Sequence, residues 1–214
     1  GEQPYWMACV LAAMLGQIGL PGGGIGFGYG AIGNLGKTAR RLRGPLFEQG
    51  RNPISDFIPV SRIADMLLNP NGTYDFNGER RTFPDIRLVY WCGGNPFHHH
   101  QDLNRLNRAW QEPEAIIVHE PWWTATAKRA DIVFPATTQF EREDIGWAKG
   151  DPYLFHMPQM IPPVGQARDD YAIFSDLCNR LGCAEEFTHN KTADQWINVI
   201  YDEFATNAKI EGVR

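Results

Sequence analysis

Three apolar segments decide the fold expected for this chain: "DIRLVYWC" (85–92), "AIIVHE" (115–120) and "DIVFPA" (131–136). Each has the length and the β-branched or aromatic content of a buried strand. The segments between them, "QDLNRLNRAW" (101–110) and "WTATAKRA" (123–130), are predicted helices. Strands that alternate with helices through short turns imply a parallel sheet with right-handed crossovers. The sequence therefore predicts an α/β fold with helices on both faces of a parallel sheet.

The flanking sequence contains more helices and one unusual glycine-rich segment. Further helices are expected at 3–17, 59–68, 169–182 and 192–208. Residues 19–36 contain nine glycines in eighteen positions, which lets the backbone approach a ligand closely. A flexible linker is the alternative, although apolar side chains interleave with these glycines. We predict two parts: residues 1–84, with the N-terminal helix, the glycine-rich loop and a loop-rich connection, and residues 85–214, which form the α/β part.

The composition argues against several classes of protein. A net charge of -5 gives no basic surface for nucleic acid. The longest apolar segment, residues 6–20, is too short and too interrupted by Gly16 and Gln17 to span a membrane. The four cysteines form no C-x-x-C pair, so no iron–sulfur cluster or zinc ribbon is expected.

Two glycines, an asparagine and three histidines follow the first predicted strand in "GGNPFHHH" (93–100). Adjacent glycines before a helix expose N–H groups that favour a phosphate, although a plain strand-to-helix turn is the alternative. Consecutive histidines in a helix point about 100° apart, so they cannot all ligate one ion, and no metal site is predicted. We expect one histidine to donate to a phosphate or a base. The predicted ligand contacts of this loop are Gly93, Gly94, Asn95, His98 and His99.

The loop after the second strand supplies a histidine and a carboxylate, His119 and Glu120. A carboxylate at this position commonly binds ribose hydroxyls, and helix capping is the alternative for Glu120. Asp170 stands at the start of a predicted helix, where a carboxylate is often structural. Its oxygens would also suit the N1 and N2 donors of guanine.

The loop after the third strand, "PATTQFERED" (135–144), supplies hydroxyls and a guanidinium. Thr137 and Thr138 suit phosphate oxygens, and Arg142 suits them through its planar fork. The neighbouring carboxylates indicate a solvated charged loop as the alternative. Because loops at the carboxyl ends of parallel strands meet, these groups should converge on one ligand. The prediction is a Rossmann-like dinucleotide-binding domain.

The sequence also resembles the dimethyl sulfoxide reductase family of molybdopterin oxidoreductases. The matching stretches are "GEQPYWM" (1–7), "LAAMLGQIGLPGGGIGFGYG" (11–30), "GGNPFHHHQDLNRL" (93–106), "WTATAKRADIVFPATTQFEREDIG" (123–146) and "QARDDYAIFSDLCNRLG" (166–182). Within that family, "RNPISDFIPVSRIADMLLNP" (51–70) and "PDIRLVYWCGGNPFHHHQDL" (84–103) are most similar to the trimethylamine N-oxide reductases. Dimethyl sulfoxide and biotin sulfoxide reduction are the alternatives inside the family.

The resemblance implies a bis(molybdopterin guanine dinucleotide) molybdenum cofactor and oxygen-atom transfer from an N-oxide or S-oxide. Carried over position by position, it places Trp6 toward the active-site funnel and Gly33 and Asn34 beside the cofactor. It also gives Asn95 and His99 to the nucleotide, Glu120 to the ribose, Arg142 to the phosphate or guanosine, and Asp170 to the guanine. Many relatives carry Asp where this chain has Glu120, and a glutamate still allows ribose bonding.

The resemblance further implies that this chain is the central part of a larger enzyme. The serine that ligates molybdenum in this branch lies ahead of these motifs, so no catalytic residue and no metal ligand are expected here, and the piece alone should be inactive. A c-type cytochrome donor and a periplasmic location are implied for the whole enzyme. Two other classes remain open: a nicotinamide-dependent dehydrogenase, against which the missing G-x-G-x-x-G counts, and a non-catalytic nucleotide-binding or assembly module.

Overall fold

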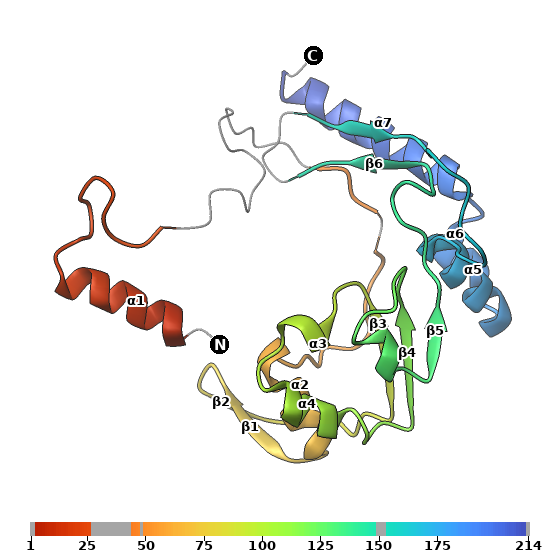
Figure 1. Ribbon diagram of the computed structural model, residues 1–214. Coiled ribbons are helices and arrows are strands. Elements are labelled where there is room, and N and C mark those ends of the chain that lie inside the picture. Colours follow the sequence, from red (N-terminus) through yellow and green to blue (C-terminus); the bar gives the residue numbers. More distant parts are fainter. Residues whose placement is uncertain (1–2, 27–43, 48, 149–152, 213–214) are drawn as a thin grey trace. The chain divides into compact units, whose positions relative to one another are not determined.

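The computed structural model describes residues 3–26, 44–47, 49–148 and 153–212 (Figure 1). Its helices are α1 (Gln3–Met14), α2 (Ile63–Leu68), α3 (Pro96–His99), α4 (Leu103–Ala109), α5 (Asp170–Leu181), α6 (Ala184–Thr188) and α7 (Ala193–Ile210), with 3-10 turns η2 (Val60–Arg62) and η3 (Ala127–Arg129). Its strands are β1 (Thr73–Phe76), β2 (Glu79–Thr82), β3 (Leu88–Cys92), β4 (Ala115–His119), β5 (Ile132–Phe134), β6 (Asp144–Gly146) and β7 (Phe155–Met157).

Backbone contacts group the chain into two compact units. One comprises 1–47, 145–157 and 195–214, and the other comprises 48–144 and 158–194. The second unit, called the sheet unit below, contains β3, β4 and β5 and the loops that follow them. The predicted boundary between residues 84 and 85 stays a prediction.

The first unit contains α1, most of α7 and a small sheet of β6 and β7. The Trp196 ring of α7 is packed 4.6 Å from that of Phe47, measured between centroids. In α1 the apolar side chains are mostly exposed, and only Ala12 is buried. The predicted helix at 3–17 is confirmed, although it ends at Met14.

The parallel sheet of the sheet unit has the strand order β3-β4-β5. Tyr90 of β3 lies opposite Ile117 of β4, and Val118 of β4 lies opposite Val133 of β5. The predicted α/β fold with a parallel sheet is thus confirmed. A Rossmann fold also reverses its strand order at a switch point, and that finer assignment stays a prediction.

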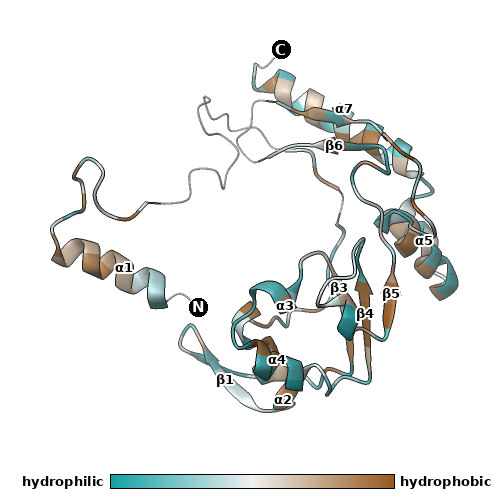
Figure 2. Ribbon diagram, viewed as in Figure 1, coloured by the Kyte–Doolittle hydropathy of each residue, from teal (hydrophilic) through white to brown (hydrophobic). Residues whose placement is uncertain are grey.

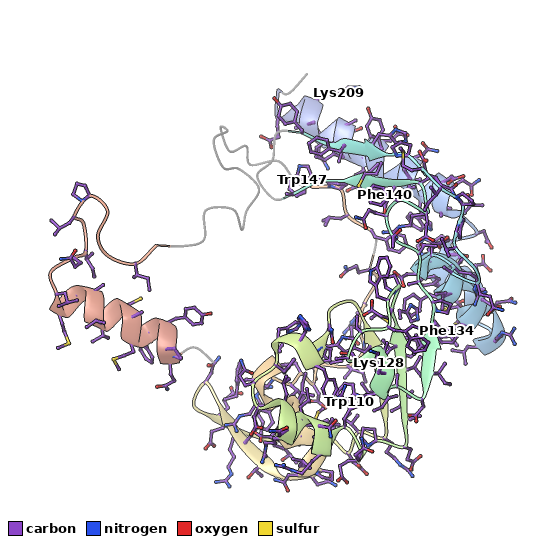
Figure 3. The ribbon with its side chains drawn as sticks, viewed as in Figure 1. Trp110, Lys128, Phe134, Phe140, Trp147 and Lys209 are labelled. Carbon is purple, nitrogen blue, oxygen red and sulfur yellow. The ribbon has the colours of Figure 1, made fainter. Side chains whose placement is uncertain are left out.

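One face of this sheet packs against α2 and α4. Alternate residues of a strand point to opposite faces, and Ile116 and Val118 of β4 point to this one. They belong to one buried cluster with Leu106 of α4 and Trp110, and these four side chains are at most 3% exposed. Figure 3 labels Trp110, and Figure 2 shows the apolar colouring of β4 and β5. Burial of one such side chain stabilises the fold by roughly 1.5–3 kcal/mol.

The other face packs against α5 and is more polar. Phe174 of α5 stacks on the His119 ring of β4 at 4.8 Å and on the Tyr90 ring of β3 at 5.8 Å, measured between centroids. Helices therefore cover both faces, as predicted. The helix α5 begins after the N-cap Asp169, whose side chain accepts from the Ala172 N–H, and ends at Gly182 with φ +77°. These bounds agree with the helix predicted at 169–182.

The loop-rich stretch before the sheet contains an antiparallel hairpin of β1 and β2, which the sequence analysis did not predict. Asn77 and Gly78 at its turn have φ +50° and +81°. An Asn-Gly pair with two positive φ angles matches the twist of a two-residue hairpin, so the signal was present in the sequence. The helix expected at 123–130 is reduced to the single turn η3.

Candidate functional site

A pocket of about 360 Å³ lies in the sheet unit at the carboxyl ends of its strands. That volume suits a small ligand group such as a nucleobase. The lining residues come from the loops after β3, β4 and β5 and from the start of α5: Gly93, His119, Pro121, Trp122, Ala136, Thr137, Thr138, Gln139, Phe140, Arg142 and Asp170. Figure 3 labels Phe140 of this set. The predicted convergence of the loops is observed for this subset.

Asp170 reaches the pocket because the chain before α5 pairs with the segment that follows β5. Ala136 and Arg168 form a parallel bridge. The Thr137 N–H donates to the Arg168 carbonyl at 3.1 Å, and the Arg168 N–H donates to the Pro135 carbonyl at 3.0 Å. This pairing continues the sheet by one short step and fixes the start of α5 beside the strand ends. A carboxylate distant in sequence is thereby placed in the pocket.

His119 joins Asp170 to Tyr90 in a hydrogen-bonded chain. Its Nδ1 lies 2.7 Å from Oδ1 of Asp170, and its Nε2 lies 2.8 Å from the Tyr90 hydroxyl. The His119 side chain is 2% exposed, whereas that of Asp170 is 55% exposed. Burial, followed by the charges of Cys92 and Asp170, raises the pKa of Tyr90, so the phenol keeps its proton. Asp170 therefore presents an exposed carboxylate to a ligand, whereas both ring nitrogens of His119 are already used.

Thr137 has a buried hydroxyl that makes no hydrogen bond to the described residues. The residue is 6% exposed and lines the pocket. Its N–H and carbonyl are both used, by the Arg168 carbonyl and by Nη1 of Arg142. A buried hydroxyl without a partner is costly, so a ligand oxygen or nitrogen at this place would satisfy it.

Arg142 is held by its own loop on two sides. Its Nε donates to Asp144 at 3.0 Å, and its Nη1 donates to the Thr137 carbonyl at 3.0 Å. Among the described residues Nη2 has no hydrogen-bond partner, and the side chain is 32% exposed. The guanidinium is therefore oriented in advance, with one nitrogen available to an anion.

Glu141 stabilises the turn that carries these groups. Its Oε2 accepts from the Thr138 N–H and the Thr138 hydroxyl, both at 2.7 Å, and its Oε1 accepts from the Val164 N–H at 2.7 Å. These bonds, those of Thr138 first, lower the pKa of Glu141. Glu141 is buried, so the solvated-loop alternative does not describe it. Thr138 lines the pocket, but its hydroxyl serves this turn.

The loop after β3 is open at its glycines. Gly93 and Gly94 have φ +76° and +73°, and no atom of the described residues lies within 4 Å of a Cβ built on Gly93. The side-chain oxygen Oδ1 of Asn95 accepts from the Thr126 hydroxyl, which ties this loop to the next one. The side chains of His98 and His99 are exposed, and Nε2 of His99 lies 3.7 Å from a Cβ built on Gly94. Of these residues only Gly93 lines the pocket.

Glu120 makes local contacts that match the capping alternative. Its carboxylate accepts from the Trp122 N–H at 3.3 Å and from the Thr124 hydroxyl at 3.1 Å. Trp6 lies in α1 and is 68% exposed. Gly33 and Asn34 lie outside the described residues. The cofactor roles predicted for all these positions stay predictions.

Tyr90 was not predicted from the sequence, and neither were the exposed aromatic residues that line the pocket, Trp122 (67% exposed) and Phe140 (58% exposed). In the sequence, Tyr90 resembles an ordinary strand residue. The only signal is its spacing of two from Cys92, which places both side chains on the same face of the strand. Among the residues that the model describes, no group of three or more His, Cys, Asp or Glu is placed to hold a metal ion. Within the same residues, no helix is long and apolar enough to cross a bilayer.

Comparisons with known proteins agree with the expected family. The model of the molybdopterin oxidoreductases matches residues 1–180. Biotin sulfoxide reductase from Cereibacter sphaeroides is 53% identical over 98% of this chain and 28% of its own length. Dimethyl sulfoxide/trimethylamine N-oxide reductase from Rhodobacter capsulatus is 44% identical over 100% of this chain and 27% of its own.

Among solved structures, acetylene hydratase from Pelobacter acetylenicus is similar over 49% of this chain and 14% of its own chain, at 22% sequence identity. The TM-score of 0.45 is too low to support an argument. The chain spans about a quarter of the length of the two curated relatives, 28% and 27%. The family model matches residues 1–180, and both relatives align over nearly the whole of this chain. The chain belongs to the molybdopterin oxidoreductase family.

Proposed function

We propose that this chain is the cofactor-holding part of a molybdenum-dependent reductase that removes an oxygen atom from an N-oxide or S-oxide. The family implies a molybdenum–molybdopterin cofactor. We propose its bis(molybdopterin guanine dinucleotide) form, with one guanine nucleotide end in the sheet-unit pocket. The observation that carries this proposal is a strand-end pocket that offers a carboxylate, an arginine and an unpartnered buried hydroxyl together.

The groups in the pocket fit a guanine nucleotide. Asp170 has one oxygen free for N–H donors, and Thr137 has a hydroxyl that needs a partner. Nη2 of Arg142 suits a phosphate, and Gly93 lets a ligand approach the backbone. When bound, the cofactor would supply two-electron oxygen-atom transfer, with molybdenum cycling between the +4 and +6 states. The residues of this chain would bind and orient it.

The remaining predicted contacts complete this proposal. Gly94, Asn95, His98 and His99 would border the nucleotide, Glu120 the ribose, and Gly33 and Asn34 another part of the cofactor; Trp6 would face the substrate funnel. Residues 85–214 would be the guanine dinucleotide-binding subdomain of a larger enzyme. That enzyme would take electrons from a c-type cytochrome in the periplasm, and this piece alone would be inactive.

Two substrate classes compete for the parent enzyme. Trimethylamine N-oxide is the first candidate, supported by the stretches at 51–70 and 84–103 and by the named activity of the R. capsulatus relative. Biotin sulfoxide is the second, because the relative named for that activity has the higher identity, 53% against 44%. Both substrates share one reaction, so the choice does not affect the cofactor proposal.

The test uses the full-length parent that contains this chain, purified from its host. We expect molybdenum with two releasable GMP per metal, and reduction of trimethylamine N-oxide with a higher kcat/KM than biotin sulfoxide or dimethyl sulfoxide. A higher value for biotin sulfoxide would exchange the two substrate candidates. A folded parent without molybdenum and GMP would overturn the proposal, and NADH binding in its place would favour a nicotinamide-dependent enzyme.

A further inference from the structure

We infer that His119, held by Tyr90, is a positioning residue that makes Asp170 select a base edge carrying two N–H donors. This inference rests on the proposed guanine site and deepens it. It concerns residues that do not offer free groups to the ligand: the open carboxylate oxygen belongs to Asp170, whereas His119 and Tyr90 act through it.

The donor and acceptor roles in the hydrogen-bonded series Tyr90–His119–Asp170 follow from the residues at its two ends. The carboxylate of Asp170 has only acceptors, so the 2.7 Å contact requires a proton on Nδ1 of His119. A neutral imidazole then has a lone pair on Nε2, and the Tyr90 hydroxyl donates to it across 2.8 Å. The aspartate thus fixes the tautomer of the histidine, the tyrosine hydroxyl satisfies its second nitrogen, and the histidine holds one oxygen of the aspartate.

Burial makes these roles rigid. His119 is 2% exposed and lies in contact with the rings of Phe174 and Phe134, with centroids 4.8 Å and 5.5 Å away. The ring therefore cannot turn to water when one of its partners is lost. If Tyr90 lost its hydroxyl, Nε2 would become a buried acceptor without a donor, and the imidazole would hold the carboxylate of Asp170 less firmly in place.

The consequence for the ligand is that the pocket presents a hydrogen-bond acceptor and selects a group with N–H donors. With His119 on Oδ1, the second oxygen of Asp170 makes no hydrogen bond to the described residues and is open to the pocket. A correctly oriented carboxylate binds N1–H and the N2 amine of guanine together, through the free oxygen and the second lone pair of Oδ1. Hypoxanthine has N1–H but lacks the amine, so it forms one of these bonds. The preference for GMP over IMP measures how well Asp170 is oriented.

The experiment measures GMP and IMP affinities by calorimetry with the cofactor-free, full-length parent. A hydrogen bond to a charged group contributes about 1.5–3 kcal/mol, so the wild type should prefer GMP by at least about tenfold. Tyr90→Phe keeps the ring that stacks on Phe174 and removes only the hydroxyl. We expect its preference to fall to less than about threefold, mainly through weaker GMP binding.

Two further variants separate positioning from packing. Phe174→Leu disturbs the same ring cluster without removing a hydrogen-bonding group, so it should weaken GMP and IMP equally and keep their ratio. His119→Gln supplies a donor and an acceptor and should keep more of the preference than His119→Leu. A wild-type preference that survives Tyr90→Phe would overturn the positioning role alone. A wild type without a preference would overturn the guanine site and this inference with it.

Discussion

The two faces of the parallel sheet are built from the same strands, but one face is an apolar packing surface and the other carries hydrogen-bonded polar groups. Toward α4, Ile116 and Val118 pack with Leu106 and Trp110 in a dry apolar cluster. Toward α5, the next residue of β4, His119, is equally buried but hydrogen-bonded on both sides of its ring. Because successive strand residues alternate between faces, one strand contributes to stability on one side and to a ligand site on the other. Substitutions on the two faces should therefore separate fold from binding.

The largest effect is expected on the apolar face. Leu106→Ala removes a side chain that is 1% exposed and should lower the stability of the sheet unit by about 2–5 kcal/mol, because the cavity cannot refill completely. Hydrogen exchange of the β4 amides in the full-length parent measures this change. Leu103→Ala on the same helix is the matched control, since Leu103 is 40% exposed. Equal effects of the two variants would contradict the assignment of this face.

On the polar face, Asp170→Asn should affect binding more than folding. The amide oxygen can still accept from His119, while an NH₂ group would replace the free oxygen and face the donors of the base. We expect the GMP retained per parent molecule to fall at least about tenfold, which corresponds to about 1.4 kcal/mol. Asp169→Asn is the control, because asparagine also caps helices well. Equal loss of GMP in both variants would mean that helix capping, not base contact, is responsible.

Thr137→Val should be favourable in the ligand-free parent and unfavourable in the ligand-loaded parent. In the ligand-free parent it removes a buried hydroxyl without a partner, so melting or exchange should report stabilisation by about 1 kcal/mol. In the loaded parent it removes a ligand contact, so nucleotide content should fall. Thr138→Val is the comparison, since that hydroxyl donates to Glu141 at 2.7 Å and its loss should destabilise the ligand-free protein. Destabilisation by Thr137→Val without ligand would show that its hydroxyl has a partner in the protein.

The smallest expected effect is a loss of local stability around Glu141 at acidic pH. The pKa of Glu141 is lowered in the folded chain from its usual 4.5, so its contribution to stability is present above that pH and is lost as pH falls through the folded value. Protection of the Val164 amide against exchange should therefore drop below about pH 4.5. Glu141→Gln should remove this dependence and lower protection at neutral pH. Unchanged acid dependence in that variant would assign the effect to another carboxylate.

The sequence by itself determined the layers of the sheet unit. Segment length and residue content located β3, β4, β5 and α5, because local propensity acts over a few positions. It also predicted that the loops after these strands would meet, since parallel strands end at one edge. That expectation is confirmed for Gly93, His119, Thr137, Thr138 and Arg142, which line one pocket.

Only the tertiary structure decided which of these groups face a ligand and which serve the fold. The sequence treated Thr137 and Thr138 alike, yet among the described residues the first hydroxyl has no partner and the second donates to Glu141. It could not pair Tyr90, His119 and Asp170, because their contacts join positions 29 and 51 residues apart. Such contacts depend on strand register and on the bridge between Ala136 and Arg168, which arise only when distant segments pack.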